Sequence, residues 1–209
     1  GGVLAKELMS VYRDWNKEDI LRAQMTGKIL WGGVRKAVSL ELLRKNNIKF
    51  TAHNVGEEAL YSFRTVYAAK SIGFIAEKPV YFYVNHEGSQ SKTRTSDPWG
   101  PVVECLKEYL EQMGLYKEYA NTLNAFNFTA TLVSLDKIEQ MYNGKQKKEI
   151  SRKRMDKFRT IYDKTAGIDC KSMSLKAKLF LPFIKQGILW PIFVCSRLRY
   201  NIKKVIRKI

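Results

Sequence analysis

The sequence predicts an α+β protein that is predominantly α-helical, with one short β-hairpin near residues 72–84. Apolar residues recur every three or four positions along most of the 209 residues, as on the buried face of a helix. The stretch IGFIAEKPVYFYVNH (residues 72–86) instead alternates and is rich in β-branched and aromatic residues, which favours strands. Hydrophobic residues make up 45% of the chain, enough to build a buried core.

The first predicted helices lie before residue 50. Residues 3–26 have helical spacing, and Asn16 suits a break that is followed by a second, shorter helix from Lys17. The glycine-rich connector MTGKILWGG comes next. Residues 34–47 return to helical spacing and end in two asparagines, which suit a helix stop.

A stronger amphipathic pattern begins at Glu57 and runs to Lys70, with Leu60, Phe63 and Tyr67 on one face. Two short strands around Glu77-Lys78-Pro79 are expected after it. The segment EGSQSKTRTSDPWGP that follows is polar and rich in turn residues, so it predicts a loop.

The chain beyond residue 100 is predicted to be helical to its end. The expected helices cover residues 101–113, 116–142, 146–165 and 172–208, with Gly114, Gly144 and Gly167 between them. These patterns divide the chain into residues 1–100, a helical extension over 101–169, and a tail over 170–209.

The net charge of +17 is concentrated in the last third of the chain. Residues 1–144 carry 18 Lys and Arg against 16 Asp and Glu, whereas residues 145–209 carry 19 against 4. The first part therefore has the charge balance of an ordinary globular domain, and the second part is suited to an anionic partner.

Cysteine and histidine are too few and too scattered to predict a zinc site. The three cysteines, Cys105, Cys170 and Cys195, form no CxxC pair, and the only histidines are His53 and His86. Unpaired thiols are typical of a reducing cytoplasm. No apolar secretory segment opens the sequence, and the leading Gly-Gly without Met predicts a piece of a longer protein.

Two carboxylates follow Gly56 at the start of the amphipathic helix, in HNVGEEALYSF (residues 53–63). At the first turn of a helix, acidic side chains are favoured by the exposed backbone N–H groups. This local explanation suffices for Glu57 and Glu58 as structural residues. A second interpretation is that one of them is a catalytic base, and the surrounding segments bear on that choice.

Residues 20–95 resemble the C-terminal half of the catalytic domain of family 2 glycosyltransferases, the inverting, GT-A type. The resemblance rests on the order of three segments, which read LWGGVRKAVSLELLRKNNIKF, GEEALYSF and GFIAEKPVYFYVNHEGSQS. It implies that residues 1–100 are the acceptor-side portion of a GT-A-like domain. It also implies that Glu58 is the general base and Glu57 its supporting neighbour, although the family usually has Asp at the position of Glu58.

The resemblance further implies a nucleotide-sugar donor, a glycan or lipid-linked acceptor, and Mg or Mn in the full-length parent. This chain has no Asp-x-Asp motif and no glycine-rich phosphate loop, so we expect no cofactor in it and no transferase activity by it alone. The resemblance implies that the loop HEGSQSKTR lies near the diphosphate, through His86, Ser89, Ser91, Lys92 and Arg94, and the alternative is a solvated turn with ordinary surface bases. Trp31 is expected either to carry the acceptor or to anchor the helix that follows.

The tail has no acidic residue after Asp169 and carries ten Lys and Arg around an apolar centre. Lys185 and two prolines interrupt that centre, which disfavours a membrane span. An interfacial helix is the better prediction, with bases meeting anionic headgroups. The residues expected at the membrane are Phe180, Phe183, Trp190, Phe193, Arg197 and Arg199. The alternative is that the apolar stretch packs on the domain.

Three functions remain open from the sequence. The first is an acceptor-side glycosyltransferase fragment on the cytoplasmic face of the cell membrane, free or as a homodimer. The second is a nucleic-acid-binding module, which the strongly apolar centre of the basic tail disfavours, so no nucleic acid is expected. The third is a non-catalytic membrane adaptor in which Glu58 is structural.

Overall fold

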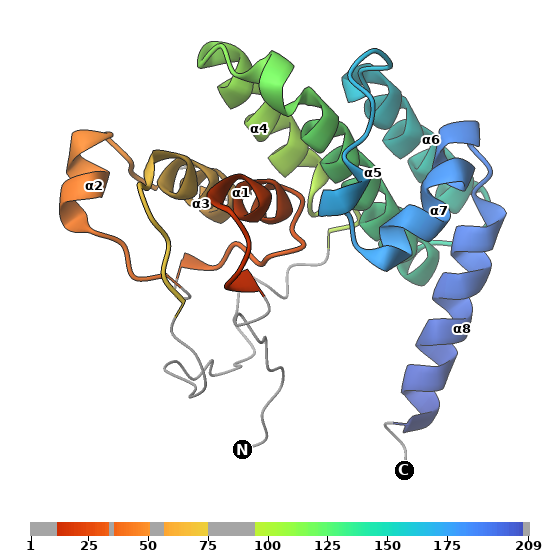
Figure 1. The fold of residues 1–209 in the computed structure, drawn as a ribbon. Coiled ribbons are helices and arrows are strands. Elements are labelled where there is room, and N and C mark those ends of the chain that lie inside the picture. Colours follow the sequence, from red (N-terminus) through yellow and green to blue (C-terminus); the bar gives the residue numbers. More distant parts are fainter. Residues whose placement is uncertain (1–11, 34–35, 51–56, 75–94, 207–209) are drawn as a thin grey trace.

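The structure, a computed structural model, describes residues 12–33, 36–50, 57–74 and 95–206. Their helices are α1 (Lys17–Met25), α2 (Leu40–Lys45), α3 (Glu57–Ala68), α4 (Gly100–Gln112), α5 (Tyr116–Met141), α6 (Gly144–Ile161), the 3₁₀ turn η4 (Cys170–Ser172), α7 (Leu175–Gln186) and α8 (Trp190–Ile206). In Figure 1, α5 lies between the N-terminal helices on one side and α6, α7 and α8 on the other.

The predicted α+β class is wrong, because the described residues form helices and no strand. Of the expected hairpin, residues 72–74 have no strand structure, and residues 75–84 lie outside the described ranges. Ile72 and Phe74 pack instead against the cluster of buried residues around α1 and α3. Helix packing therefore covers these two apolar side chains, which we expected a paired strand to cover.

Local signals set several helix ends correctly. Asn16 caps α1, its side chain accepting a hydrogen bond from the backbone N–H of Asp19 at 2.8 Å, so the predicted break before Lys17 is confirmed. The helix expected over 34–47 is shorter, since Ser39 caps α2 at Leu40. The single helix expected over 172–208 is interrupted at Gly187, which adopts a left-handed φ of 72°.

Helix α5 connects two buried clusters. One combines α1, α3 and α4 with Tyr119, Leu123 and Phe126 of α5. The other combines α6, α7 and α8 with Phe128 and Leu135 of the same helix. Because α5 is covered on several sides, its polar residues need internal partners. Asn127 donates a hydrogen bond to the carbonyl of Phe158 at 2.9 Å, which ties α5 to α6.

A buried ion pair joins α6 to the segment before α4. Arg154 of α6 is 3% exposed, and its Nε lies 3.2 Å from Oδ1 of Asp97. Asp97 also accepts hydrogen bonds from Ser134 Oγ at 2.6 Å and from the N–H of Gly100 at 3.0 Å. A Cβ at Gly100 would lie 2.2 Å from the Asp97 carboxylate, so only glycine fits there. Burial lowers the pKa of Arg154, and the charge of Asp97 opposes that shift.

Candidate functional site

The predicted catalytic carboxylates lie in the first turn of α3. Glu57 is half-buried and Glu58 is exposed. The Oε1 atom of Glu58 accepts a hydrogen bond from the backbone N–H of Gly33 at 3.3 Å. One carboxylate oxygen is thus oriented by the connector after α1, although 25 residues separate the two positions.

Trp31 is held beside Glu58 by its backbone as well as by its ring. Its carbonyl accepts a hydrogen bond from Ser62 Oγ of α3 at 2.7 Å. Its half-buried ring packs edge-on against Phe126 and tilted against Trp99, with centroid separations of 5.6 and 5.2 Å. These contacts anchor Trp31 on α3, α5 and Trp99 and not on the following helix α2, so both roles expected of it stay predictions. This anchor fixes the connector against the start of α3.

An exposed aromatic side chain near Glu58 was not singled out from the sequence. Phe50 is 53% exposed and stacks on Tyr61 of α3 with ring centroids 4.2 Å apart. A Cβ at Gly33 would lie 3.2 Å from the Phe50 ring, so the ring lies against the residue that contacts Glu58. The signal in the sequence was the motif Ile48-Lys49-Phe50. It entered the prediction only as the end of the first segment that resembles the glycosyltransferase family.

The residues expected at the donor diphosphate lie outside the described ranges. His86, Ser89, Ser91, Lys92 and Arg94 therefore stay predictions. Over the ranges that are described, no three His, Cys, Asp or Glu side chains gather as at a metal site. No residues can be assigned to the metal expected in the parent.

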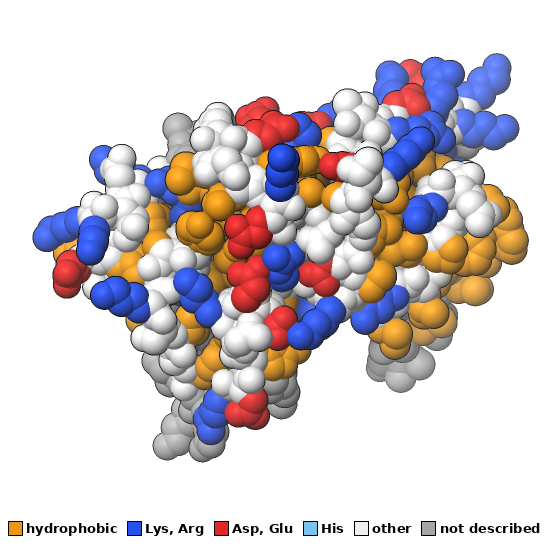
Figure 2. All heavy atoms as spheres, turned by 45° about the horizontal axis from the view of Figure 1, so that its top comes forward, with side chains coloured by type: hydrophobic (Ala, Val, Ile, Leu, Met, Phe, Trp, Pro, Cys, Tyr) orange, Lys and Arg blue, Asp and Glu red, His pale blue; other side chains and the backbone are white. Residues whose placement is uncertain are grey.

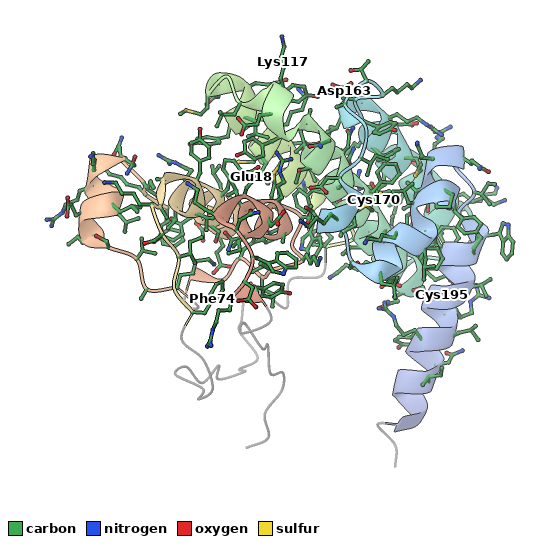
Figure 3. All side chains as sticks on the ribbon, viewed as in Figure 1. Glu18, Phe74, Lys117, Asp163, Cys170 and Cys195 are labelled. Atoms are coloured by element: carbon green, nitrogen blue, oxygen red, sulfur yellow. The ribbon has the colours of Figure 1, made fainter. Side chains whose placement is uncertain are left out.

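Glu18 and Asp19 form a second pair of adjacent acids, and they lie in the first turn of α1. Glu18, labelled in Figure 3, accepts hydrogen bonds from Arg22 Nε at 2.6 Å and from the hydroxyl of Tyr119 at 3.2 Å. Oε2 therefore joins α1 to α5, whereas Oε1 is bonded within α1. Cys170 and Cys195, also labelled in Figure 3, are exposed free thiols on separate elements.

The aromatic residues expected at a membrane divide into two groups. Phe180 and Phe193 are half-buried and pack against the cluster formed by α5 to α8, and Phe183 is half-buried beside Phe180. Trp190 is 67% exposed. With it, Val194, Leu198 and Ile202 are exposed at intervals of four residues, so they share one face of α8.

These four residues line an open hollow of about 620 Å³. We call them the apolar stripe. Leu175 and Leu179 of α7 are exposed apolar residues as well. In Figure 2, hydrophobic side chains cover much of the right-hand side of the molecule, where Figure 1 places α7 and α8. The spacing of the apolar stripe by four positions can be recognised in the sequence, but the predicted membrane contacts rested mainly on aromatic side chains.

The arginines expected at anionic headgroups face α5. Arg197 donates to Glu139 at 2.8 Å, and Arg199 pairs with Asp136. Burial by itself would raise the pKa of the Glu139 carboxyl, but hydrogen bonds from Lys147 and Arg197 outweigh it, and the pKa lies below its ordinary value. These pairs fix α8 on α5 with the apolar stripe turned outward.

No described helix has the length and apolar character that crossing a bilayer requires. Comparison of the whole chain with protein-family models, with curated proteins and with solved structures gives no match.

Proposed function

We propose that this chain is the acceptor-side part of an inverting glycosyltransferase, with Glu58 as the general base. The observation that carries the proposal is the position of the exposed Glu58 carboxylate, which accepts a hydrogen bond from Gly33, a residue of the same connector as Trp31. The resemblance likewise assigns Trp31 and Glu58 to one site, with Trp31 expected at the acceptor and Glu58 as the base. The proposal concerns this site and does not depend on a sheet-containing fold.

The chemistry requires a fixed carboxylate with one free oxygen. In inverting transfer, an acceptor hydroxyl attacks the anomeric carbon opposite the leaving nucleotide diphosphate, and a base accepts its proton. Gly33 orients Oε1 of Glu58, and no described residue bonds Oε2, which can therefore take the proton of the acceptor hydroxyl. The exposed ring of Phe50 offers an apolar face on which a sugar ring can stack.

The donor would be a nucleotide sugar, bound by a half that this chain does not supply. The direct test is sugar transfer by a protein that joins this chain to such a donor-binding half. The proposal requires that turnover depend on Glu58 while the fold does not. Transfer by this chain alone would contradict the expectation that it lacks the donor site.

We also propose that the chain is attached peripherally to an anionic membrane, on the cytoplasmic side. The apolar stripe supplies side chains that can enter the interfacial layer, since Trp190 and Leu198 are 67% and 58% exposed. Ten Lys and Arg and no acidic residue follow Asp169, so the segment that carries the stripe is strongly cationic. The combination favours a negatively charged lipid surface over a neutral apolar partner.

Replacing Leu198 by Asp tests this attachment. Full burial of a leucine side chain contributes about 1.5–3 kcal/mol, so we expect affinity for vesicles of phosphatidylcholine and phosphatidylserine to fall at least about tenfold. The measurement is co-sedimentation across a salt series. Leu40→Asp on α2 is the matched control, because Leu40 is 57% exposed and lies outside the stripe. An equal loss in both variants would contradict a role for the stripe.

A further inference from the structure

A basic groove lies between α6 and the segment that runs from the end of α7 into α8. Its volume is about 260 Å³. From α6 it is lined by Lys148, Ser151, Arg152 and Arg159, and from the other side by Gly187 and Phe193. No acidic side chain lines it. The groove therefore collects positive charge from one face of α6.

Part of that charge forms no close ion pair among the described residues, although Glu149 lies near enough to Arg152 to feel its charge. Lys147, which also lines the groove, pairs with Glu139 at 2.8 Å, and Arg159 pairs with Asp156 at 3.0 Å. Over the described chain, Lys148 and Arg152 form no ion pair. Two cationic side chains, four residues apart on one helix, are thus available to an anion that enters the groove.

Ser151 adds an uncharged donor to these cations. The residue is 3% exposed, and its hydroxyl has no hydrogen-bond partner within the structure. Leaving a buried hydroxyl unpartnered costs about 1–3 kcal/mol, and such a group calls for an explanation. A ligand oxygen in the groove would accept from Ser151 as well as from Arg152.

The apolar residues that line the groove indicate what kind of molecule bears the bound anionic group. Leu189 and Phe193 line the groove and flank Trp190 of the apolar stripe in the sequence. A phosphate monoester suits several convergent donors, because its oxygens are strong acceptors and pair well with guanidinium. We propose that the groove binds the phosphate group of a lipid whose chains lie in the surface contacted by the apolar stripe. This inference rests on the proposed membrane attachment.

The test measures binding of the full chain to phosphatidylcholine vesicles that contain either phosphatidic acid or phosphatidylserine at matched surface charge. Phosphatidic acid presents an uncovered phosphate monoester, whereas serine covers the phosphate of the second lipid. We expect about tenfold tighter binding to the phosphatidic acid vesicles, because a phosphate monoester offers three terminal oxygens to the convergent donors of the groove, whereas the diester of phosphatidylserine offers two. Equal binding to both would overturn the groove proposal and leave the membrane attachment standing.

Two variants locate the preference in the groove. Ser151→Ala removes a hydroxyl that has no protein partner, so thermal stability should not fall, and we expect the preference for phosphatidic acid to drop severalfold. Arg152→Gln should reduce it further. Lys157→Gln is the matched control, because it removes one positive charge from the same helix at a residue that pairs with Glu104 outside the groove. A preference unchanged in both groove variants would overturn the proposal.

Two further measurements distinguish a lipid phosphate from free phosphate, and the groove proposal from the proposal of membrane attachment. Inorganic phosphate at constant ionic strength should leave vesicle binding unchanged, and displacement by it would overturn the assignment to a lipid. If the chain binds no vesicles, the membrane attachment fails. Titration with water-soluble, short-chain phosphatidic acid then tests the groove alone. A Kd that Ser151→Ala and Arg152→Gln leave unchanged would overturn the groove as well.

Discussion

Replacing Glu58 by Gln should lower the rate of sugar transfer by roughly 10²–10⁴-fold, the contribution of a positioned general base. The amide has nearly the shape of the carboxylate and can still accept the hydrogen bond from Gly33 N, so the connector should stay in place. It cannot take a proton from the acceptor hydroxyl at neutral pH. The measurement is kcat, with a donor-binding half supplied as above, together with a circular dichroism spectrum to show that the fold is retained.

Two matched variants sharpen this result. Glu57→Gln removes the same charge from the same helical turn, and we expect less than about tenfold loss because its charge contributes only through the helix start. Glu58→Asp restores the residue usual in the family that this chain resembles. It draws the carboxylate back by more than ~1 Å, a displacement that can change the rate about 10²-fold in either direction. Equal losses in Glu57→Gln and Glu58→Gln would contradict the assignment of the base.

Replacing Asp97 by Ala should lower the free energy of unfolding by about 3–5 kcal/mol. The change leaves the guanidinium of Arg154, at 3% exposure, without its carboxylate partner, and it also removes the acceptor of Ser134 Oγ and Gly100 N. Two guanidinium nitrogens, Nη1 and Nη2, already have no partner in the structure. Urea unfolding followed by circular dichroism measures the effect.

A double variant distinguishes the ion pair from simple loss of packing. Arg154→Met combined with Asp97→Ala should recover part of the lost stability, because no uncompensated charge then remains buried. Lys157→Gln serves as the control, since the 3.4 Å pair of Lys157 with Glu104 is exposed and is expected to contribute no more than about 1 kcal/mol. A cost for Asp97→Ala similar to that of the control would show that the pair does not hold α6 in place.

Helix positions could be predicted from the sequence because their signals are local. Ser174 caps α7 by accepting from the N–H of Ala177, and Gly114 and Gly187 adopt the left-handed conformation that ends a helix. The hairpin could not be excluded in this way. An alternating segment is compatible with a strand, but a strand needs a partner, and Ile72 and Phe74 find helices instead.

The candidate site was predictable in part. The motif singled out Glu58 and Trp31, yet the bond from Gly33 and the stacking of Phe50 on Tyr61 depend on how the connector folds back onto α3. The membrane-facing residues show the same limit. The sequence located the cationic, apolar segment, but the aromatic side chains chosen from it largely pack inward, and Leu198 and Ile202 face outward.

The sequence by itself determined where most helices begin and end, where the positive charge is concentrated, and which pair of acids is a candidate base. Only the tertiary structure decided which of those charges are available. Arg197 and Arg199 are paired with Glu139 and Asp136, roughly sixty residues away, while Lys148 and Arg152 form no ion pair with any residue that the structure describes. The physical reason is that helix capping depends on neighbours along the chain, whereas burial and ion pairing depend on contacts between helices far apart in sequence.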